Sequence, residues 1–448
     1  MYSLLAGKII YPLGDFILGS SIMKYYHWLK KTQWWSPEQL QELQNEKLRA
    51  LVKHAFNNVS YYQRIFQERG LTDKDIQTIN DLSKLPILTK SDIRRNFKDM
   101  LARDFKRWKP ILNSSGGSTG EPLKYYITKD FVSISWAGKF RGFGWAGYNI
   151  GDKRIKFGGT SLVPGNDKSL FETIRNKLER NLNVSALSMN KSKYKKFIDT
   201  IRKYKPKYLN SYASNLYQFA DYCKNNNVND ITFKAIFSTS ELLLPRFRML
   251  IENQFKCKVF NEYGAYDGGA QAFECEKHDG FHVSVEKAVM EIVNERGQGV
   301  IPLERGRIIL TDLHNYVMPF IRYEVGDMGV FANNPCGCGR TLPLLKAIEG
   351  RTTDVIKLPN GNIITGVLIT SVFAERPVKQ FQVVHKAGNT LFLKIVKDEN
   401  YTEADTNHIA GILKHHAGKD IEIEIEYCNT IPVSENSKYK YIISYKST

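Results

Sequence analysis

The sequence predicts an α/β protein with a large N-terminal domain over residues 1–350 and a small α+β domain over residues 351–448. A chain of 448 residues is too long for one ordinary hydrophobic core, so at least two domains are expected. Between residues 154 and 263, short apolar strands alternate with helical stretches, which is the pattern of an α/β sheet. From Val383 onward, apolar and polar residues alternate as they do in half-exposed strands, with one helix among them.

The individual elements follow from local signals. The first hundred residues are expected to be a helical segment, and residues 36–70 read as helix. Ser36-Pro37-Glu38 is a capping start with proline in the first turn, and Gly70 closes the segment. In the large domain, a strand that ends in a turn is predicted at 154–159, further strands at 208–212, 235–238 and 259–263, and a helix over 192–204. In the small domain, strands are predicted at 383–384, 391–396 and 421–426, with a helix over 403–415. Gly350-Arg351 is the natural domain boundary.

Residues 1–22 are apolar but do not form a recognisable secretory signal or membrane span. They lack the basic start and the small-residue cleavage site of a signal peptide. Lys8, Pro12 and Asp15 also interrupt the apolar run, which argues against a spanning helix. Two interpretations stay open: a segment packed on the protein body, or one that rests on a membrane surface with the help of nearby lysines. The protein is therefore expected in the cytoplasm, with the inner face of the membrane as an alternative location.

The composition indicates the kind of binding partner but does not identify one. Hydrophobic residues make up 42% of the chain and aromatics 12%, as expected for a folded protein, and the formal net charge is +18. That charge favours an anionic partner such as a nucleotide, coenzyme A or acidic lipid. No nucleic-acid-binding motif accompanies it, so nucleic acid is not an expected partner. Six cysteines in a chain of this length do not indicate a disulfide scaffold.

A glycine- and serine-rich loop lies between two extended segments near residue 115. Its chemistry is carried by Ser114, Ser115, Gly116, Gly117, Ser118, Thr119 and Gly120. Glycines let backbone N–H groups turn toward an anion and hydroxyls add donors, which suits a triphosphate. The loop is not a Walker A loop, because no Gly-Lys-Ser/Thr follows at the required spacing. Taken alone, such a loop is more often a plain connection.

Two strand ends carry polar residues suited to a nucleotide. Ser240 and Glu241 follow one strand, and Asn261, Tyr263, Gly264 and Asp267 lie at the end of the next. A tyrosine there offers a flat face to an adenine ring, an asparagine can bond the edge of the ring, and a carboxylate can hold Mg²⁺. The alternative is an ordinary strand–turn–helix connection with a buried tyrosine.

A second constellation lies nearer the domain boundary. Asp327 follows a tight glycine turn, and its two carboxylate oxygens suit the two hydroxyls of a ribose. Arg351 is a candidate partner of the ribose or a phosphate, with a surface salt bridge as the alternative use of its side chain.

A third group has the spacing of a metal site. Cys275-X-X-His278 precedes Cys336-X-Cys338, and three thiolates with one imidazole form a tetrahedral zinc set. Such a closed set makes the zinc structural, because no position is left for water. Unlinked reduced cysteines are the alternative, and His282 is a possible substitute for the histidine ligand.

These motifs occur in the order found in the adenylate-forming superfamily. The chain resembles its phenylacetate–coenzyme A ligase branch, and most closely the CapK-type proteins of capsular polysaccharide biosynthesis, over about residues 48–444. The resemblance implies adenine stacking by Tyr263, magnesium binding by Asp267 and ribose binding by Asp327. It also implies a small mobile C-terminal domain that pivots at Asp354. Asp267 departs from the family, which usually has glutamate there.

The resemblance also implies a catalytic lysine in a C-terminal loop. That lysine falls on Lys438, with Lys440 as the second candidate, and it would offset charge as the carboxylate attacks the α-phosphate. Val433 and Ser437 replace the arginine and glycine expected in the loop. The four zinc-type positions also occur in many relatives.

The function implied is adenylation of a carboxylic acid with ATP and Mg²⁺, followed by acyl transfer. The acceptor is either coenzyme A or an amine or hydroxyl of a sugar or glycan. The polysaccharide subset is favoured by the similarity of Thr311 to Pro319. An acyl–coenzyme A ligase of small-molecule metabolism and a nucleotide-binding scaffold without activity are the alternatives. The sequence identifies neither the acid nor the oligomeric state.

Overall fold

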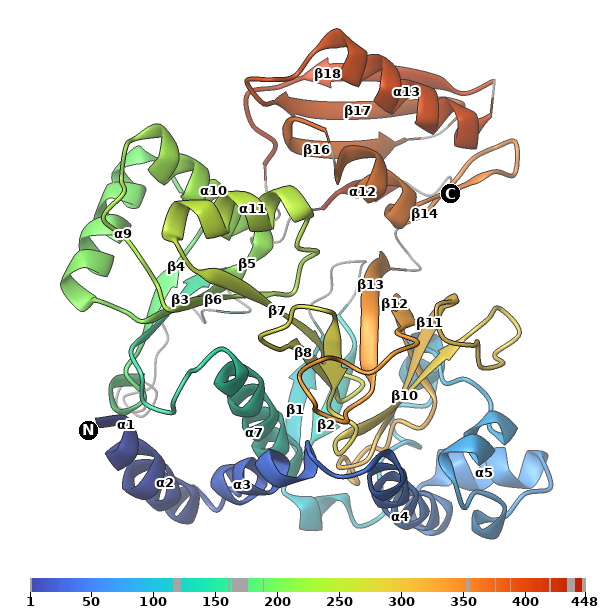
Figure 1. The fold of residues 1–448 in the computed structure, drawn as a ribbon. Coiled ribbons are helices and arrows are strands. Elements are labelled where there is room, and N and C mark those ends of the chain that lie inside the picture. The colour runs from blue at the N-terminus through green and yellow to red at the C-terminus, as the bar shows by residue number, and fades with distance from the viewer. Residues whose placement is uncertain are drawn as a thin grey trace.

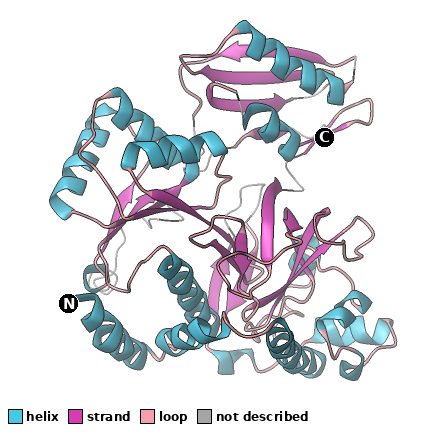
Figure 2. Ribbon diagram, viewed as in Figure 1, coloured by secondary structure: helices cyan, strands magenta, loops and turns pink. Residues whose placement is uncertain are grey.

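The structure is a computed structural model of the chain. It describes residues 2–115, 122–159, 162, 176–187, 189–351, 355–374, 376–386, 388–418, 420–432 and 440–444. One long sheet with helices on both faces forms the body, and a smaller sheet with two helices forms a separate C-terminal layer (Figures 1 and 2). The predicted α/β class with a small α+β C-terminal unit is confirmed.

The N-terminal part is helical, as predicted. Its elements are α1 (Tyr2–Leu5), the π-helical turn η1 (Ala6–Ile10), α2 (Tyr11–Leu18), α3 (Ile22–Thr32), α4 (Pro37–Asn58), α5 (Ser60–Glu68), η2 (Asp73–Asp75), η3 (Ile79–Lys84), α6 (Lys90–Arg95) and η4 (Phe105–Trp108). The predicted capping start is present. The Ser36 side chain accepts a hydrogen bond from the Gln39 backbone N–H, and the Gln39 side chain accepts one from the Ser36 backbone N–H.

The single helix predicted over residues 36–70 is wrong in one respect, because the segment divides into α4 and α5 at Val59. Val59 has extended backbone angles and forms a bridge with Ala102, so the chain leaves the helix for one residue. Val59 is fully buried, and this tertiary contact overrides the local helical pattern.

The long sheet has a parallel half and an antiparallel half. Its strand order is β10-β11-β12-β13-β9-β8-β7-β6-β5-β3-β4. The parallel strands are β3 (Arg154–Gly158), β4 (Asn181–Ser185), β5 (Tyr208–Tyr212), β6 (Ala235–Thr239) and β7 (Lys258–Ala265). The antiparallel strands are β8 (Ala270–Glu274), β9 (Phe281–Val283), β10 (Ala288–Val293), β11 (Arg305–Asp312), β12 (Tyr323–Phe331) and β13 (Leu344–Arg351). A separate hairpin, β1 (Ile111–Ser114) with β2 (Lys124–Ile127), flanks the glycine-rich loop.

Helices cover both faces of the parallel strands. On one face, α9 (Lys191–Tyr204), α10 (Ala213–Asn225) and α11 (Pro245–Phe255) pack their apolar residues against those of the sheet. On the other face, α7 (Lys129–Trp145) packs Phe140 and Phe143 against Tyr208 and Phe237. The Phe143 and Phe237 rings are stacked, with centroids 3.8 Å apart. Side chains alternate across a strand, so the carboxyl ends of β6 and β7 are held between two apolar layers.

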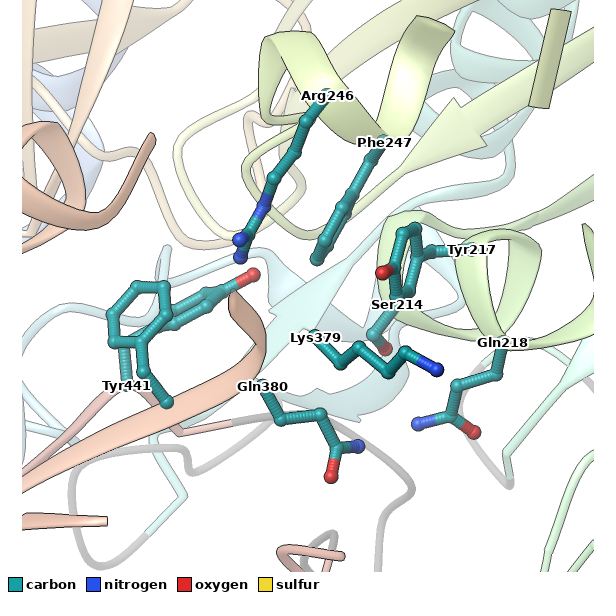
Figure 3. Close-up of a pocket in the computed structure, with 9 residues that line it drawn as sticks. Ser214, Tyr217, Gln218, Arg246, Phe247, Lys379, Gln380 and Tyr441 are labelled. Atoms are coloured by element: carbon teal, nitrogen blue, oxygen red, sulfur yellow. The ribbon is translucent and has the colours of Figure 1, made fainter. Parts of the chain in front are cut away.

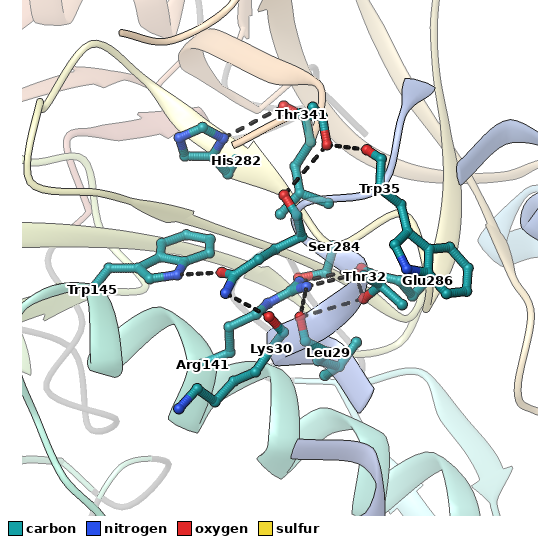
Figure 4. A network of polar contacts seen from close by, with 12 residues as sticks. Leu29, Lys30, Thr32, Trp35, Arg141, Trp145, His282, Ser284, Glu286 and Thr341 are labelled. Atoms are coloured by element: carbon teal, nitrogen blue, oxygen red, sulfur yellow. Dashed lines mark hydrogen bonds and ion pairs between the residues drawn. The ribbon is translucent and has the colours of Figure 1, made fainter. Parts of the chain in front are cut away.

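A buried polar network ties the N-terminal helices to the body (Figure 4). Arg141 of α7 and Glu286 form an ion pair at 2.6 Å, and their side chains are 1% and 0% exposed. Glu286 also accepts a hydrogen bond from Thr32 of α3, and Ser284 accepts one from Arg141. Breaking one partner of such a pair leaves an uncompensated buried charge. This network therefore anchors α3 to α7 and to the segment before β10.

The C-terminal unit begins after β13. It contains the hairpin β14 (Val355–Lys357) and β15 (Ile363–Thr365), helices α12 (Gly366–Ala374) and α13 (Glu403–Ala417), and a sheet in the order β18 (Glu422–Tyr427), β17 (Thr390–Lys397), β16 (Val378–His385) and β19 (Ile442–Ser444). The strands and helix predicted beyond Val383 correspond to β16, β17, β18 and α13. The domain boundary at residues 350–351 stays a prediction.

Candidate active site

The carboxyl ends of β6 and β7 bring the first group of predicted residues to one edge of the sheet. Ser238 of β6 pairs with Asn261 of β7 in parallel register, so Ser240 and Tyr263 follow on neighbouring strands. Ser240 has a φ of +65°, a left-handed conformation that turns the chain sharply out of the strand. Ligands of α/β proteins bind at this kind of strand end.

Glu241, which follows β6, makes a contact that was not predicted from the sequence. Its Oε2 accepts a hydrogen bond from the Ser214 backbone N–H, 2.9 Å away, in the first turn of α10. A carboxylate at a helix N-terminus satisfies a backbone donor that otherwise lacks a partner. Glu241 therefore positions α10 against the strand end, and its predicted place in the nucleotide site is not tested by this contact.

The predicted adenine and ribose residues touch each other. The Tyr263 hydroxyl donates to Oδ2 of Asp327 over 2.8 Å, although the two residues are 64 positions apart. Both side chains are half-buried at the same edge of the sheet. Asp327 also pairs with Arg351 across the β12–β13 ladder, which brings the backbone of the predicted arginine beside it. A tyrosine ring beside a carboxylate is an arrangement that fits a base and its sugar together.

The predicted magnesium ligand has a tyrosine partner that sequence reasoning missed. The Tyr323 hydroxyl donates to Oδ2 of Asp267 over 2.8 Å. Burial and the nearby Asp267 carboxylate raise the pKa of Tyr323, so the phenol keeps its proton and remains a donor. The only sequence signal for Tyr323 is its place four residues before Asp327 in the same motif.

The side chain of Arg322 fixes the start of β12, the strand that carries Tyr323 and Asp327. Its guanidinium is buried, pairs with Glu291 at 3.1 Å and donates to the carbonyl oxygens of Leu85 and Gly297 at 2.8 Å. These contacts fasten the start of β12 to β10 and to the N-terminal region. The strand that carries both site residues is thus fixed before it reaches the site.

Several predicted residues lie partly or wholly outside the described residues. Gly116, Gly117, Ser118, Thr119 and Gly120 belong to an undescribed stretch, and so does Lys438. The base of the loop is described: Ser115 exchanges two hydrogen bonds with the Leu123 backbone N–H and carbonyl, at 3.0 and 2.9 Å, which closes the β1–β2 hairpin. Lys440, the second lysine candidate, is exposed, and its carbonyl accepts a hydrogen bond from Gln382.

The metal-like cluster is present, but with a different histidine. The ligand atoms of Cys275, His282, Cys336 and Cys338 all lie within 4.8 Å of one another. The Sγ atoms of Cys275 and Cys336 are 3.6 Å apart, and Cys338 Sγ is 3.3 Å from His282 Nε2. Tetrahedral zinc with Zn–S bonds of about 2.3 Å places two sulfurs roughly 3.7 Å apart, so the donor set fits zinc.

The environment of this cluster orients its ligands. His282 Nδ1 lies 3.4 Å from the Leu342 carbonyl oxygen, which leaves Nε2 directed at the sulfurs. Burial lowers the pKa of His282 to about 4, so the imidazole is neutral, as a metal ligand must be. Backbone N–H groups two residues after Cys275 and Cys338 approach the sulfurs at 3.4 and 3.5 Å.

The imidazole that lies beside the three thiols is that of His282, the substitute candidate, and not that of His278. His278 has a φ of +57°, its ring lies 4.7 Å from the Phe260 ring, and its Nδ1 is 3.1 Å from Glu274 Oε2. His282 lies on β9, which pairs with β8 and β13 and so stands between the two cysteine segments. Sheet pairing, not sequence spacing, selects the ligand.

The C-terminal unit contacts the body beside α10 and α11. A small hollow there is lined by Ser214, Tyr217, Gln218, Arg246, Phe247, Lys379, Gln380, Phe381 and Tyr441 (Figure 3). Arg246 of α11 donates to the carbonyl oxygens of Arg376 and Val378 at the start of β16. These bonds hold the small sheet against α11 in this arrangement.

Known proteins resemble this chain over most of its length. Residues 356–445 match the family model described as the CapK C-terminal domain. The chain is 27% identical to Protein CapK of Staphylococcus aureus, over 94% of this chain and 92% of that protein. It is 26% identical to phenylacetate-coenzyme A ligase of Escherichia coli (strain K12), over 89% of this chain and 94% of that protein.

Solved structures show the same fold. A 2-hydroxyisobutyryl-CoA ligase in the postadenylation state, in complex with 2-HIB-AMP, superposes with a TM-score of 0.74 at 17% identity, over 92% of this chain and 90% of that one. An open conformation of that ligase, in complex with 2-HIB-AMP and CoA, gives a TM-score of 0.61 at 18% identity, over 90% and 91%.

The fold and the relatives together define an adenylate-forming ligase. The resemblance predicted from the motifs is confirmed. Within that class, the chain is similar to Protein CapK over nearly its whole length, and its C-terminal part matches the CapK C-terminal domain model.

Proposed function

We propose that this protein converts a carboxylic acid and ATP to an acyl-adenylate and pyrophosphate, and then passes the acyl group to an acceptor with release of AMP. The observation that carries the proposal is the contact between Tyr263 and Asp327 at the end of β7. Two residues assigned to the two ends of one adenosine, from segments far apart in sequence, meet at a half-buried strand end. An ordinary strand–turn–helix connection does not require that meeting.

In the proposed site, Tyr263 stacks on adenine and Asp327 accepts the ribose hydroxyls. The loop from Ser114 to Gly120 receives the triphosphate, and Arg351 approaches the ribose or a phosphate. Mg²⁺ held by Asp267 would supply positive charge to the triphosphate. The Tyr323 hydroxyl fixes one carboxylate oxygen of Asp267 and so sets the direction of the other.

The chemistry of the first half-reaction is an in-line displacement at the α-phosphorus. A carboxylate oxygen of the acid forms the new bond to phosphorus, the bond between the α- and β-phosphoryl groups breaks, and pyrophosphate leaves. Lys438 offsets the negative charge that develops between the carboxylate and the α-phosphate. The first half-reaction consumes ATP, a nucleotide of the cell interior, which supports a cytoplasmic location.

The second half-reaction follows a movement of the small domain about Asp354. The resemblance to the adenylate-forming family implies this movement, and the 2-hydroxyisobutyryl-CoA ligase has itself been solved in a postadenylation state and in an open conformation. The hydrogen bonds of Arg246 to the start of β16 are the contacts that the movement breaks. These hydrogen bonds join main-chain oxygens to a single side chain. Moving that side chain therefore breaks them without unfolding either domain.

The acceptor proposed is an amine or hydroxyl of a sugar or glycan in surface polysaccharide synthesis. The similarity to Protein CapK over nearly the whole chain and the matching C-terminal domain model support it. Coenzyme A is the second candidate, supported by the similarity to phenylacetate-coenzyme A ligases. The small domain is the part that approaches the acceptor, and it is also the part that the CapK model matches.

We also propose that Cys275, His282, Cys336 and Cys338 hold a structural zinc. The ligands join the β8–β9 turn to the β12–β13 turn, and so fasten the antiparallel half of the sheet. All four positions of a tetrahedral zinc are filled by protein, so the metal takes no part in catalysis.

The test is pyrophosphate release with a panel of carboxylic acids that includes amino acids and aryl acids. The proposal expects release with at least one acid, and trapping of the acyl-adenylate by hydroxylamine. ATP binding without pyrophosphate release for every acid would overturn it in favour of an inactive nucleotide-binding scaffold. With the acid known, addition of coenzyme A or of amino sugars separates the two acceptors.

A further inference from the structure

The N-terminal helical segment exposes an unusual number of large apolar side chains. Phe16 is 84% exposed and Ile17 is 69% exposed, and both lie in the last turns of α2. The other exposed apolar residues of this segment are Leu4, Leu5, Ile9, Leu13 and Leu18. Single exposed apolar residues are normal on soluble proteins, but a contiguous group on one short segment indicates an interaction surface.

The spacing shows that these residues form one face. Leu5, Ile9, Leu13 and Phe16 recur every three or four positions, which places them along one side of a helix. Two other residues of the segment are buried: Ala6, which is 0% exposed, and Tyr11, whose ring meets that of Phe140 on α7 edge to face at 5.5 Å. The segment is therefore anchored to the body by one face and presents an apolar face to its surroundings.

The charges within residues 1–37 are mostly basic. Among residues 1–37, Lys8, Lys24, Lys30 and Lys31 are basic and exposed, and Asp15 is the single acidic residue. The Asp15 carboxylate has hydrogen-bond partners within the segment: it accepts from the Ser20 hydroxyl at 2.5 Å and from the Met23 backbone N–H at 2.7 Å. Its carboxylate thus stabilises the start of α3.

Helix α3 continues the basic character beside the apolar helix. Its lysines lie at positions 24, 30 and 31, about two turns apart, and all are exposed, while Leu29 and Thr32 are buried toward the body. Lys129 at the start of α7 is also exposed, and its Nζ donates to the Leu18 carbonyl oxygen at 2.9 Å, at the end of α2. Figure 1 shows α1, α2 and α3 together at one edge of the molecule, outside α7.

We propose that α1, η1, α2 and α3 form a membrane-binding surface for a bilayer rich in anionic phospholipids. The apolar face of α1 and α2 enters the boundary between headgroups and acyl chains, and the lysines contact lipid phosphates. The contact is peripheral: in the described parts of the chain, no helix is both long and apolar enough to span a membrane. The inference does not depend on the adenylation reaction.

The experiment is co-sedimentation of the full-length protein with phosphatidylcholine vesicles, with and without phosphatidylglycerol. Wild type is expected to bind the phosphatidylglycerol vesicles and to bind pure phosphatidylcholine much more weakly. Phe16→Ser with Ile17→Ser should weaken vesicle binding about tenfold or more, because two large apolar side chains no longer enter the bilayer. Met249→Ser with Ile301→Ser is the matched control, because those side chains are 61% and 67% exposed elsewhere and should not change binding.

A second pair of variants tests the charge. Replacing Lys24, Lys30 and Lys31 by Gln should weaken binding to anionic vesicles and reduce its salt dependence. Replacing Lys195, Lys196 and Lys203 by Gln, on the exposed side of α9, removes the same charge elsewhere and should have little effect.

Three results would overturn the proposal. One is no vesicle binding by a wild type that is folded by circular dichroism. Another is unchanged binding by the Phe16→Ser and Ile17→Ser variant. The third is a wild type that forms a dimer in sedimentation velocity and does not bind vesicles, with the dimer lost in the Phe16→Ser and Ile17→Ser variant. The apolar face would then be an interface between two copies.

Discussion

Asp327→Asn separates a nucleotide-binding carboxylate from a structural one. In the structure, Asp327 accepts a hydrogen bond from Tyr263 over 2.8 Å at a half-buried position. The substitution keeps the shape of the side chain, removes its charge and replaces one acceptor by a donor. If the carboxylate binds the ribose hydroxyls, a charge-assisted hydrogen bond worth about 1.5–3 kcal/mol is lost. The Kd for ATP should then rise roughly ten- to hundredfold.

The assay is calorimetric titration with ATP beside a thermal melt of the same protein. Tyr263→Phe is the matched variant, because it removes the hydrogen bond between Tyr263 and Asp327 and keeps the ring that stacks on adenine. Both variants should lose a similar, small part of the free energy of unfolding. Only Asp327→Asn should weaken ATP binding strongly.

The structural alternative makes a different forecast. If Asp327 serves only Tyr263, the two variants will behave alike, with a lower melting temperature and unchanged affinity for ATP. That result would refute the ribose assignment, and with it the contact on which the proposed function depends.

Three further predictions concern the loop lysine, the metal and the buried ion pair. Lys438→Ala should abolish pyrophosphate exchange and leave the Kd for ATP nearly unchanged, because the lysine acts on charge that develops during the reaction. Protein purified without added metal should contain about one equivalent of zinc by elemental analysis, and His282→Ala should lose it while His278→Ala keeps it. Glu286→Gln should lower the free energy of unfolding by about 3–5 kcal/mol in chemical denaturation, because Arg141 is left as an unpaired buried charge.

Each of these has a result that contradicts it. Pyrophosphate exchange at the wild-type rate in Lys438→Ala would exclude that lysine, and Lys440→Ala would be measured next. Equal zinc content in the two histidine variants would remove His282 as a ligand. A Glu286→Gln variant as stable as wild type would mean that water reaches Arg141 and the pair is not sealed from solvent.

Short-range signals predicted the elements well. The Ser36 cap formed as expected, and the strands around residues 155, 209, 236 and 260 lie where β-branched and aromatic residues cluster. These features depend on neighbours a few positions away, so their physical causes are written in the local sequence. The order of the motifs was also enough to recognise the class of enzyme.

Contacts between segments that are distant in sequence could not be predicted from these short-range signals. Tyr323 meets Asp267 across 56 positions and Tyr263 meets Asp327 across 64. Apart from its place in the motif of Asp327, nothing local distinguishes Tyr323 from other buried tyrosines. The divided helix at Val59 has the same origin, because the bridge to Ala102 outweighs helix propensity.

The sequence by itself determined the α/β class, the family and the residue types of the site. It also determined the basic, apolar N-terminal segment, since these depend on composition, order and periodicity. Only the tertiary structure decided which histidine joins Cys275, Cys336 and Cys338, and which face of α2 remains exposed. The physical reason is that both are settled by packing: strand pairing carries His282 between the cysteines, and the contact of Tyr11 with Phe140 on α7 turns the face with Phe16 outward.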